Sequence, residues 1–594
     1  EEVLPATSVS ANLDKLADSP KEALNTLAEH FATAGSLPAD QLQPTPELLH
    51  KHAHALSTPS AEDGGFTEEA VANACASLQK INSAPGSDGI TTRFLKSAGP
   101  IAISCITLVL NYSWKHGVLP KRWREANVKA LFKHSTTDRG DPNNYRPISL
   151  TSILCKLCER LVLARLWTLV GNRISARQFG FRPKHSTIDA LSYLEYQIRL
   201  AFRKRAHASV AFLDISKAFD RAWHAGILAK LSDIGITGCP WRWCRAFLSD
   251  RRLRTVQDGV SSDWFSPNAG VPQGSVLSPF LFLVFINDVE QSVQGNAIAI
   301  MFADDIALVP VETGTDGDRQ LQNALNALET WAKRWRVTFN TKKSNVMTFS
   351  SERVKKAKRQ PKKRAAKQPA ERAKQAEQAA KKFAEEMKQE RKQPKQKPQI
   401  RPFFLCNSVL AVVEQVDYLG VRWQPNLNWS AHIDKVVASA TRVAGYITAL
   451  LHRNGPSASV IRQLCHALIR TKILYGMPVW KPSSDKQWSR LDAVIAEPLR
   501  RCLGLPKSAD TKSILVESNT LWTKKQFDVL CLTTTHRALS LPKEHPANSV
   551  TSSQLAWKTA AKRSPPVPHH ARSICKDYNA PTVCDVKQPQ IPPR

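Results

Sequence analysis

The sequence has no apolar run long enough to cross a membrane. Its longest, residues 280–286, falls far short of the about 20 residues that a helical span needs. Pro279 and Asn287 bound this run, so we interpret it as a buried core segment. A signal-peptide pattern is also missing after the first residue, Glu1, and we expect a fragment or a processed piece. No membrane partner is expected.

Acidic residues are scarce relative to basic ones: 51 Asp and Glu stand against 83 Lys and Arg, which gives a formal net charge of +32. Clustered Lys and Arg gain free energy by releasing counterions from phosphates, so the expected partner is nucleic acid. The excess is uneven, because residues 353–401 alone carry 19 Lys and Arg against 5 Glu. This stretch also has very few large apolar side chains, and we predict a solvated basic insertion that is disordered or partly helical.

The 12 cysteines have irregular spacing and no secretory context, so we expect free thiols. Cys155 and Cys158 form a lone C-x-x-C within an apolar helical pattern, which favours buried helix thiols over a zinc site.

Hydrophobic periodicity divides the middle of the chain into two stretches. Residues 66–205 alternate helical patterns with loops. The stretch that follows mixes short β-type runs with helices, so the fold class is α+β. Its predicted elements are strands at 209–213 and 297–309, a helix ending near residue 231 and an amphipathic helix at 318–336.

The two ends of the chain are less informative. The role of residues 1–65 is unreadable, and residues 541–594 are rich in Pro, Ser and Lys, which indicates a linker-like tail. Between the insertion and this tail, amphipathic helices are predicted at 432–447 and 460–474.

Two adjacent carboxylates, Asp304 and Asp305, lie between apolar runs in residues 297–310. Carboxylates among apolar strands cost several kcal/mol to desolvate unless a cation or hydrogen bonds compensate. A divalent metal would do so, although an ordinary hairpin turn explains this pair equally well when it is considered alone.

Another apolar run ends at Asp214, and Asp220 follows it. Two metal ions about 3.5–4 Å apart can bridge convergent carboxylates and carry out phosphoryl transfer. We therefore hypothesise that Asp214, Asp304 and Asp305 hold two metals. For Asp220 we favour a structural role, capping or pairing within its own helix.

Eight motifs in a fixed order carry a family resemblance. They are APGSDGI (84–90), NYRPISL (144–150), QFGFR (178–182), FLDISKAFD (212–220), GVPQGSVLSP (270–279), FADD (302–305), NTKKSNVMTF (340–349) and YLGV (418–421). From about residue 78 to 505 the chain resembles the reverse transcriptase of non-LTR (LINE-type) retrotransposons, such as the Jockey and ingi groups.

The resemblance implies a right-hand polymerase. Its parts would be fingers (66–205), a palm carrying the catalytic aspartates (206–350), the basic insertion (351–401), the primer-grip end of the palm (402–425) and a helical thumb (426–540). The implied function is RNA-directed DNA synthesis from a 3′-hydroxyl with dNTPs, an RNA template and a DNA primer or target. The alternatives are an inactive or domesticated RNA-binding remnant and a group II intron maturase-like protein.

The resemblance also assigns residues. The metal residues would be Asp214, Ile215, Asp304 and Asp305, holding two Mg²⁺ ions with Mn²⁺ as the alternative. Phe219 would be the steric gate against ribonucleotides, with plain core packing as the competing interpretation.

The remaining implied residues contact the substrates. Gln273 and Gly274 would lie at the template base and the nucleotide, and Lys343, with Lys342 as second choice, would protonate the leaving pyrophosphate. Cations near the triphosphate would be Lys133, Arg146 and Arg182, and the primer grip would be Tyr418, Leu419 and Gly420. Lys343 and Lys342 are equally well explained as surface charges, and which of Lys133, Arg146 and Arg182 lies at the triphosphate stays open.

Full elements of this type usually carry an endonuclease before the polymerase, and we recognise none here. The basic insertion is longer than the family predicts. It would bind element RNA or act as a nuclear import signal around residues 355–367, or it is simply a tolerated solvated insertion. We expect a nuclear protein with cytoplasmic passage; host, target site and oligomeric state are not determined by the sequence.

Overall fold

The computed structural model describes residues 10–12, 15–16, 19–78, 83–133, 138–171, 173–351, 402–451, 455–555 and 567–577. Helices and two larger sheets alternate along these ranges, so the α+β class is confirmed. The predicted basic insertion lies outside the described residues, except for Ser351.

The central sheet has six strands in the order β11-β12-β10-β5-β9-β8. Its strands are β5 (Ala208–Leu213), β8 (Ala297–Phe302), β9 (Asp305–Pro310), β10 (Asn345–Phe349), β11 (Phe403–Leu405) and β12 (Ser408–Val412). Every residue of β5 is buried, and this strand pairs antiparallel with both β9 and β10. The strands predicted at 209–213 and 297–309 are therefore confirmed.

Helices cover this sheet. They are α7 (Thr187–Arg203), α8 (His224–Asp233), α10 (Ser278–Ile286), α11 (Val289–Ser292) and α12 (Gly314–Trp335). The predicted amphipathic helix is α12, and α10 is the predicted buried core segment. The predicted helix that ends near residue 231 is α8, which begins only at His224, because residues 216–220 before it form turns.

A second sheet has four strands in the order β4-β3-β6-β7. They are β3 (Glu125–Phe132), β4 (Tyr145–Leu150), β6 (Arg252–Gln257) and β7 (Val260–Ser261). The predicted boundary between fingers and palm at residue 205 puts β6 with the palm. This assignment is wrong, because β6 pairs parallel with β3 in the second sheet. Pairing between strands so distant in sequence leaves no trace in local periodicity.

Five helices flank the second sheet: α3 (Glu68–Ala76), α4 (Thr92–Lys96), α5 (Pro100–His116), α6 (Ile153–Val170) and α9 (Gly238–Leu248). Cys155 and Cys158 are fully buried on α6, as predicted. Burial raises the pKa of both thiols, so they are inert core residues.

The N-terminal segment is part of the folded body. Helix α1 (Pro20–Ala34) packs Leu27 and Phe31 against Val128 and Tyr145 of the second sheet. Ser19 caps the start of this helix by accepting from the Glu22 amide.

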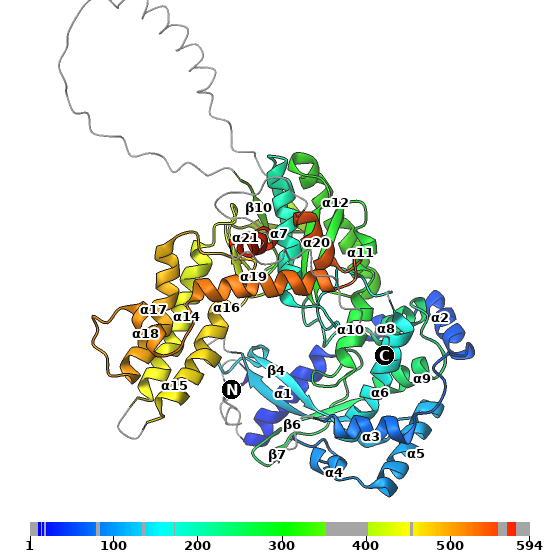
Figure 1. Ribbon diagram of the computed structural model, residues 1–594. Coiled ribbons are helices and arrows are strands. Elements are labelled where there is room, and N and C mark those ends of the chain that lie inside the picture. The colour runs from blue at the N-terminus through cyan, green and yellow to red at the C-terminus, as the bar shows by residue number, and fades with distance from the viewer. Residues whose placement is uncertain are drawn as a thin grey trace, which may run out of the picture.

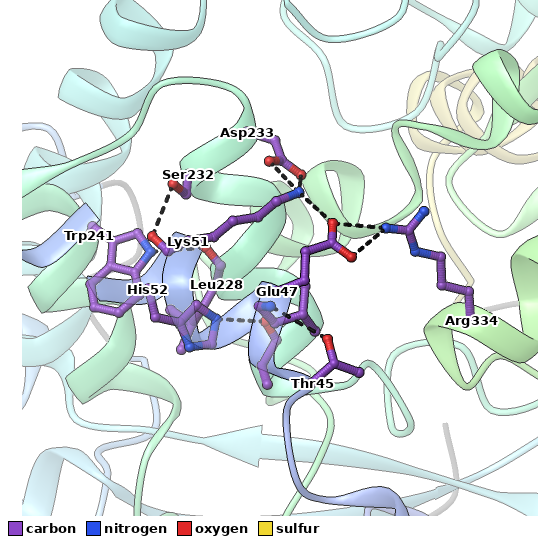
Figure 2. Close-up of polar contacts among 11 residues, drawn as sticks. Thr45, Glu47, Lys51, His52, Leu228, Ser232, Asp233, Trp241 and Arg334 are labelled. Carbon is purple, nitrogen blue, oxygen red and sulfur yellow. Dashed lines mark hydrogen bonds and ion pairs between the residues drawn. The ribbon is translucent and has the colours of Figure 1, made fainter. Parts of the chain in front are cut away.

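Helix α2 (Pro46–Ser57) reaches the helices of the central sheet instead. Figure 2 shows Lys51 between Glu47 and Asp233, with Glu47 also paired to Arg334 of α12. These ion pairs are largely exposed and each adds about 0–1 kcal/mol, so they orient the helix more than they hold it.

The C-terminal third is helical after the hairpin of β13 (Val416–Tyr418) and β14 (Val421–Trp423). Its helices are α14 (Ser430–Ala449), α15 (Ala458–Leu464), α16 (Thr471–Leu474), α17 (Asp485–Cys502), α18 (Thr511–Glu517) and α19 (Thr523–Ser540), with a π-helical turn at Cys465–Arg470. The helices predicted at 432–447 and 460–474 are confirmed.

The linker-like interpretation of residues 541–594 is wrong for two stretches, α20 (Pro546–Leu555) and α21 (Val567–Asp577). Ala571, Ile574 and Cys575 of α21 are buried, at a helical spacing that the surrounding Pro and Lys obscured. Figure 1 shows α19 running from the α14–α18 group toward α20, which packs on α7. Among the described residues, no helix combines the length and apolarity of a membrane span.

Candidate active site

The turn between β8 and β9 carries two of the predicted carboxylates. Phe302 pairs with Asp305 across this hairpin, and Ala303 enters the turn with a φ of +55°. Because Leu213 of β5 pairs with Ile306 of β9, Asp214 follows its strand beside Asp305. Strand pairing thus brings carboxylates from two distant segments to one edge of the central sheet.

Burial raises the pKa of all three carboxylates, and neighbouring carboxylates raise the pKa of Asp304 and Asp305 further. Burial and the charges of Asp304 and Asp214 raise the pKa of Asp305 to about 6. Burial and Asp214 likewise raise the pKa of Asp304. The pKa of Asp214 is raised by burial, against the opposing effects of Lys343 and a hydrogen bond with Asn340. The edge therefore concentrates negative charge that the protein only partly neutralises.

Whether these groups fit a divalent ion depends on chemistry and on spacing. Carboxylate oxygens are the hard donors that Mg²⁺ and Mn²⁺ prefer. In the part of the chain that the structure describes, however, no three His, Cys, Asp or Glu side chains are grouped closely enough to hold a metal as they stand. The three carboxylates therefore have the right chemistry for a divalent ion, but they are not grouped around one point. This spacing is expected for like charges that repel each other.

A cleft of about 530 Å³ opens in front of this edge. Its walls come from α1, the second sheet, the turns after β5 and the segment before β10. Of the predicted site residues it is lined by Lys133, Arg146, Asp214, Ile215, Phe219, Gln273, Asp304 and Lys343. His30 and Phe31 of α1, Lys217 and Asn340 also line it and were not predicted. For the two α1 residues, no motif in the sequence gave a signal.

The cations of the cleft repel one another. Burial, Lys343 and Arg146 lower the pKa of Lys133, whose Nζ donates to the Asn143 carbonyl at 2.6 Å. A polyanion such as a triphosphate would relieve this repulsion.

Asp220 does not pair within its own helix, so that interpretation was wrong. It lies in a turn, and its Oδ1 accepts from Gln273 Nε2 at 2.8 Å. The Gln273 carbonyl in turn accepts from the Ser149 amide at 2.7 Å. Asp220 thus holds Gln273 at the cleft wall, and its burial raises its pKa.

Gly274 adjoins Gln273 but does not line the cleft. Its φ is +122°, and a Cβ there would lie 2.6 Å from the Ser149 carbonyl oxygen. Its small size therefore serves the close approach of this loop to β4.

Phe219 is half-buried: it packs against other aromatic rings and also borders the cleft. Its ring stacks on Phe282 of α10 at 4.5 Å between centroids and meets Phe181 edge-on at 6.0 Å. It also lines the cleft. Both core packing and the gate role are compatible with this position, and the gate stays a prediction.

Arg182 is not brought to the cleft. Its guanidinium donates to the carbonyls of Ser175 and Gln178, and burial lowers its pKa. The side chain therefore braces its own loop.

Tyr418, predicted in the primer grip, has a side chain that is only 4% exposed. Its ring packs on Phe212, and its hydroxyl donates to the Ile300 carbonyl at 3.4 Å. Only Leu419 and Gly420, at the tip of the β13–β14 turn, are left to face a partner.

Comparisons with known proteins agree with this geometry. Residues 133–423 match the family described as reverse transcriptase (RNA-dependent DNA polymerase). The chain contains a reverse transcriptase domain. This match includes the whole central sheet, strands β4, β6 and β7 of the second sheet, and all eight cleft residues that the sequence predicted.

Relatives of the reverse transcriptase domain come from mobile elements of Drosophila melanogaster. The RNA-directed DNA polymerase from mobile element jockey is 27% identical over 504 residues, covering 82% of this chain and 49% of the relative. The probable RNA-directed DNA polymerase from transposon BS is 32% identical over 343 residues, covering 56% and 37%. That from transposon X-element is 32% identical over 281 residues, covering 46% and 31%.

These matches confirm the resemblance to reverse transcriptases of non-LTR retrotransposons. The chain spans about half or less of the length of these relatives.

Proposed function

We propose that this protein is an RNA-directed DNA polymerase of a non-LTR retrotransposon, which extends a primer 3′-hydroxyl with dNTPs on an RNA template. The observation that carries the proposal is a single cleft whose lining combines Asp214 and Asp304 with Lys133, Arg146 and Lys343. Carboxylates for divalent ions and cations for phosphates are the two requirements of phosphoryl transfer.

The right-hand description is part of this proposal. The central sheet with α8, α10 and α12 corresponds to the palm, and the second sheet with its helices, including β6 and β7, corresponds to the fingers. The helices from α14 to α18 correspond to the thumb, where Lys435 and Arg442 are candidates for contacts with the duplex backbone.

Asp214, Asp304 and Asp305 would hold the divalent ions, with Ile215 beside them. When bound, two Mg²⁺ or Mn²⁺ ions would activate the attacking hydroxyl and neutralise charge on the leaving phosphate. The carboxylates accept this role only when deprotonated, and their raised pKa values mean that cation binding must displace protons in part of the population.

The chain's own residues would complete the site. Lys133 and Arg146 would bind and orient the triphosphate, and Lys343 Nζ would hold the proton that the leaving pyrophosphate takes. Gln273, held by Asp220, would contact the base pair being formed.

Phe219 would exclude ribonucleotides by contact with the 2′-hydroxyl. The stacked Phe282 behind it supports this role, because the ring cannot retreat into the core. Phe219→Val is expected to admit ribonucleotides, and unchanged sugar discrimination would remove the assignment.

Localisation is a separate proposal. The cationic run at residues 355–367 supports nuclear entry, where the DNA target lies. Replacing its lysines with glutamine should leave a fluorescent fusion in the cytoplasm; unchanged nuclear signal would contradict the proposal.

The test of the main proposal is Mg²⁺-dependent extension of a DNA primer on an RNA template. The wild type should extend the primer, and Asp304→Asn should not. The matched control is Asp316→Asn on α12, which exchanges an exposed carboxylate far from the cleft and should extend as the wild type does. Equal extension by Asp304→Asn and the wild type would overturn the assignment, and a wild type without activity would leave an RNA-binding remnant as the better description.

A further inference from the structure

The QFGFR segment lies along the outer edge of the central sheet beside β8. The Phe179 amide donates to the Met301 carbonyl at 2.8 Å, and the Met301 amide donates to the Arg177 carbonyl at 2.9 Å. Gln178 and Met301 form a parallel bridge. The segment therefore extends the sheet at the strand that leads into the carboxylate turn.

The Gln178 side chain reaches past this edge to the turn itself. It is 1% exposed, and its Oε1 accepts from the Gly180 amide at 2.9 Å and from the Ala303 amide at 3.0 Å. Two donors facing one atom fix the orientation of the amide, because a flipped Nε2 would point at both. In the described ranges Nε2 has no hydrogen-bond partner, so the buried Gln178 side chain makes its hydrogen bonds through Oε1 alone.

Ala303 needs such support. Its φ of +55° lies in the left-handed region that disfavours residues with a Cβ. The residue immediately precedes Asp304, so its conformation sets the direction in which the chain leaves β8.

Gly180 and Arg182 adapt the segment to this contact. A Cβ on Gly180 would lie 2.5 Å from the Ala303 amide nitrogen, so only glycine allows the approach. Arg182 donates to the Gln178 carbonyl at 3.3 Å and holds the loop from the other side. Gln178 and Gly180, which do not line the cleft, thus both closely approach the backbone amide of Ala303 at the cleft edge.

We propose that Gln178 is a positioning residue, which fixes Ala303 in the left-handed conformation and thereby sets where Asp304 and Asp305 lie. This inference rests on the proposed polymerase function for its kinetic consequence only. Its structural part, the restraint on the turn, stands on the hydrogen bonds above.

The first test replaces the acceptor without changing size. Gln178→Met should lower kcat by about 10- to 100-fold, because a small displacement of catalytic groups has effects of this order. KM for dNTP should stay within about twofold, since Lys133, Arg146 and Gln273 lie on other segments. The matched control is Gln526→Met, which removes a buried glutamine of α19 and should leave kcat unchanged below the melting temperature.

A rescue variant tests the route through Ala303. Glycine adopts a positive φ without strain, so Ala303→Gly in the Gln178→Met background should recover several-fold of the lost kcat. A Gln178→Met enzyme with wild-type kcat, or an equal rise in KM for dNTP, would overturn the proposal, as would a double variant no faster than Gln178→Met.

Hydrogen exchange separates this inference from the polymerase assignment. In wild type the Ala303 amide is hydrogen-bonded, and in Gln178→Met it should exchange at least about tenfold faster, with or without polymerase activity. Unchanged exchange would overturn the inference even in an active polymerase. A wild type without activity combined with the faster exchange would instead overturn the polymerase function and leave the restraint intact.

Discussion

Lys230 and Asp305 are two charged side chains whose pKa values the fold shifts, but Lys230 is buried and Asp305 lies at an exposed edge of the central sheet. The Lys230 ammonium donates to the Phe285 carbonyl and lies 2.6 Å from Asp288 Oδ1. Its nitrogen also lies 3.8 Å from the centre of the Trp335 ring. Burial still lowers the pKa of Lys230 to about 8, but the neighbours supply an opposite charge and aromatic faces.

Asp305 has neighbours of its own sign. Burial together with Asp304 and Asp214 raises its pKa to about 6, and no cation counteracts this shift. A charged side chain with a structural role is paired with opposite charges of the protein itself. A charged side chain that binds a ligand lacks such partners until the ligand is bound. The comparison therefore separates a structural ammonium from the carboxylates to which we assign the proposed metal site.

The largest expected effect is the loss of primer extension when a carboxylate of the proposed metal site is changed. Asp214→Asn should reduce primer extension by at least about 10³-fold, because it removes a carboxylate on which the proposed metal site depends. The free energy of unfolding should be unchanged or higher, since one of three repelling charges is gone. Single-turnover extension and urea unfolding measure the two quantities, and a large loss of stability would make this carboxylate structural.

The opposite pattern is expected at Lys230. Lys230→Met should lower the free energy of unfolding by about 1–3 kcal/mol, because Asp288 loses its charged partner. Extension per folded molecule should be retained, since α8 does not line the cleft. Lys333→Met is the control: its pair with Glu329 is exposed, so this change should lower the free energy of unfolding far less than Lys230→Met does.

The sequence alone identified the elements that have a strong local pattern. The hairpin with Asp304 and Asp305 follows from two apolar runs, and α12 follows from leucines at helical spacing. The eight motifs added the cleft residues from Arg146 to Lys343, because each motif is local in sequence.

Features that depend on distant partners were out of reach. Periodicity shows that β6 is a strand but cannot show that it pairs with β3, and nothing in α1 indicates that it borders the cleft. Arg182 and Tyr418 belong to the right motifs but point into the protein. A motif fixes which residues lie near a site, whereas side-chain direction depends on packing from elsewhere in the chain.

A smaller effect is expected on KM for dNTP when Lys133, one of the cations that line the cleft, is changed. Lys133→Met should raise KM for dNTP about tenfold, which corresponds to about 1.4 kcal/mol, because one of several phosphate contacts is lost. Its effect on kcat should be smaller, since Arg146 and Lys343 remain. Lys121→Met, which changes a lysine outside the cleft, should leave both constants unchanged. Steady-state extension at varied dNTP decides the matter, and an equal KM for both variants would contradict a substrate role.

The smallest effect concerns pH and tests whether Lys230 is as enclosed as its contacts indicate. Its folded-state pKa of about 8 lies below the about 10.4 of an unfolded lysine. Between these values the unfolded chain binds more protons than the folded chain, so the wild type should gain stability relative to Lys230→Met as pH rises.

The slope of this difference should reach about 1 kcal/mol per pH unit and vanish below about pH 7, where Lys230 is protonated in both states. The other charged groups facing Lys230 are Asp288, Asp233 and Arg334. Urea unfolding of both proteins from about pH 7 to about pH 10 measures the difference. A flat difference would mean that water reaches the ammonium, and Lys230 would then lose its place as the structural counterpart of the cleft carboxylates.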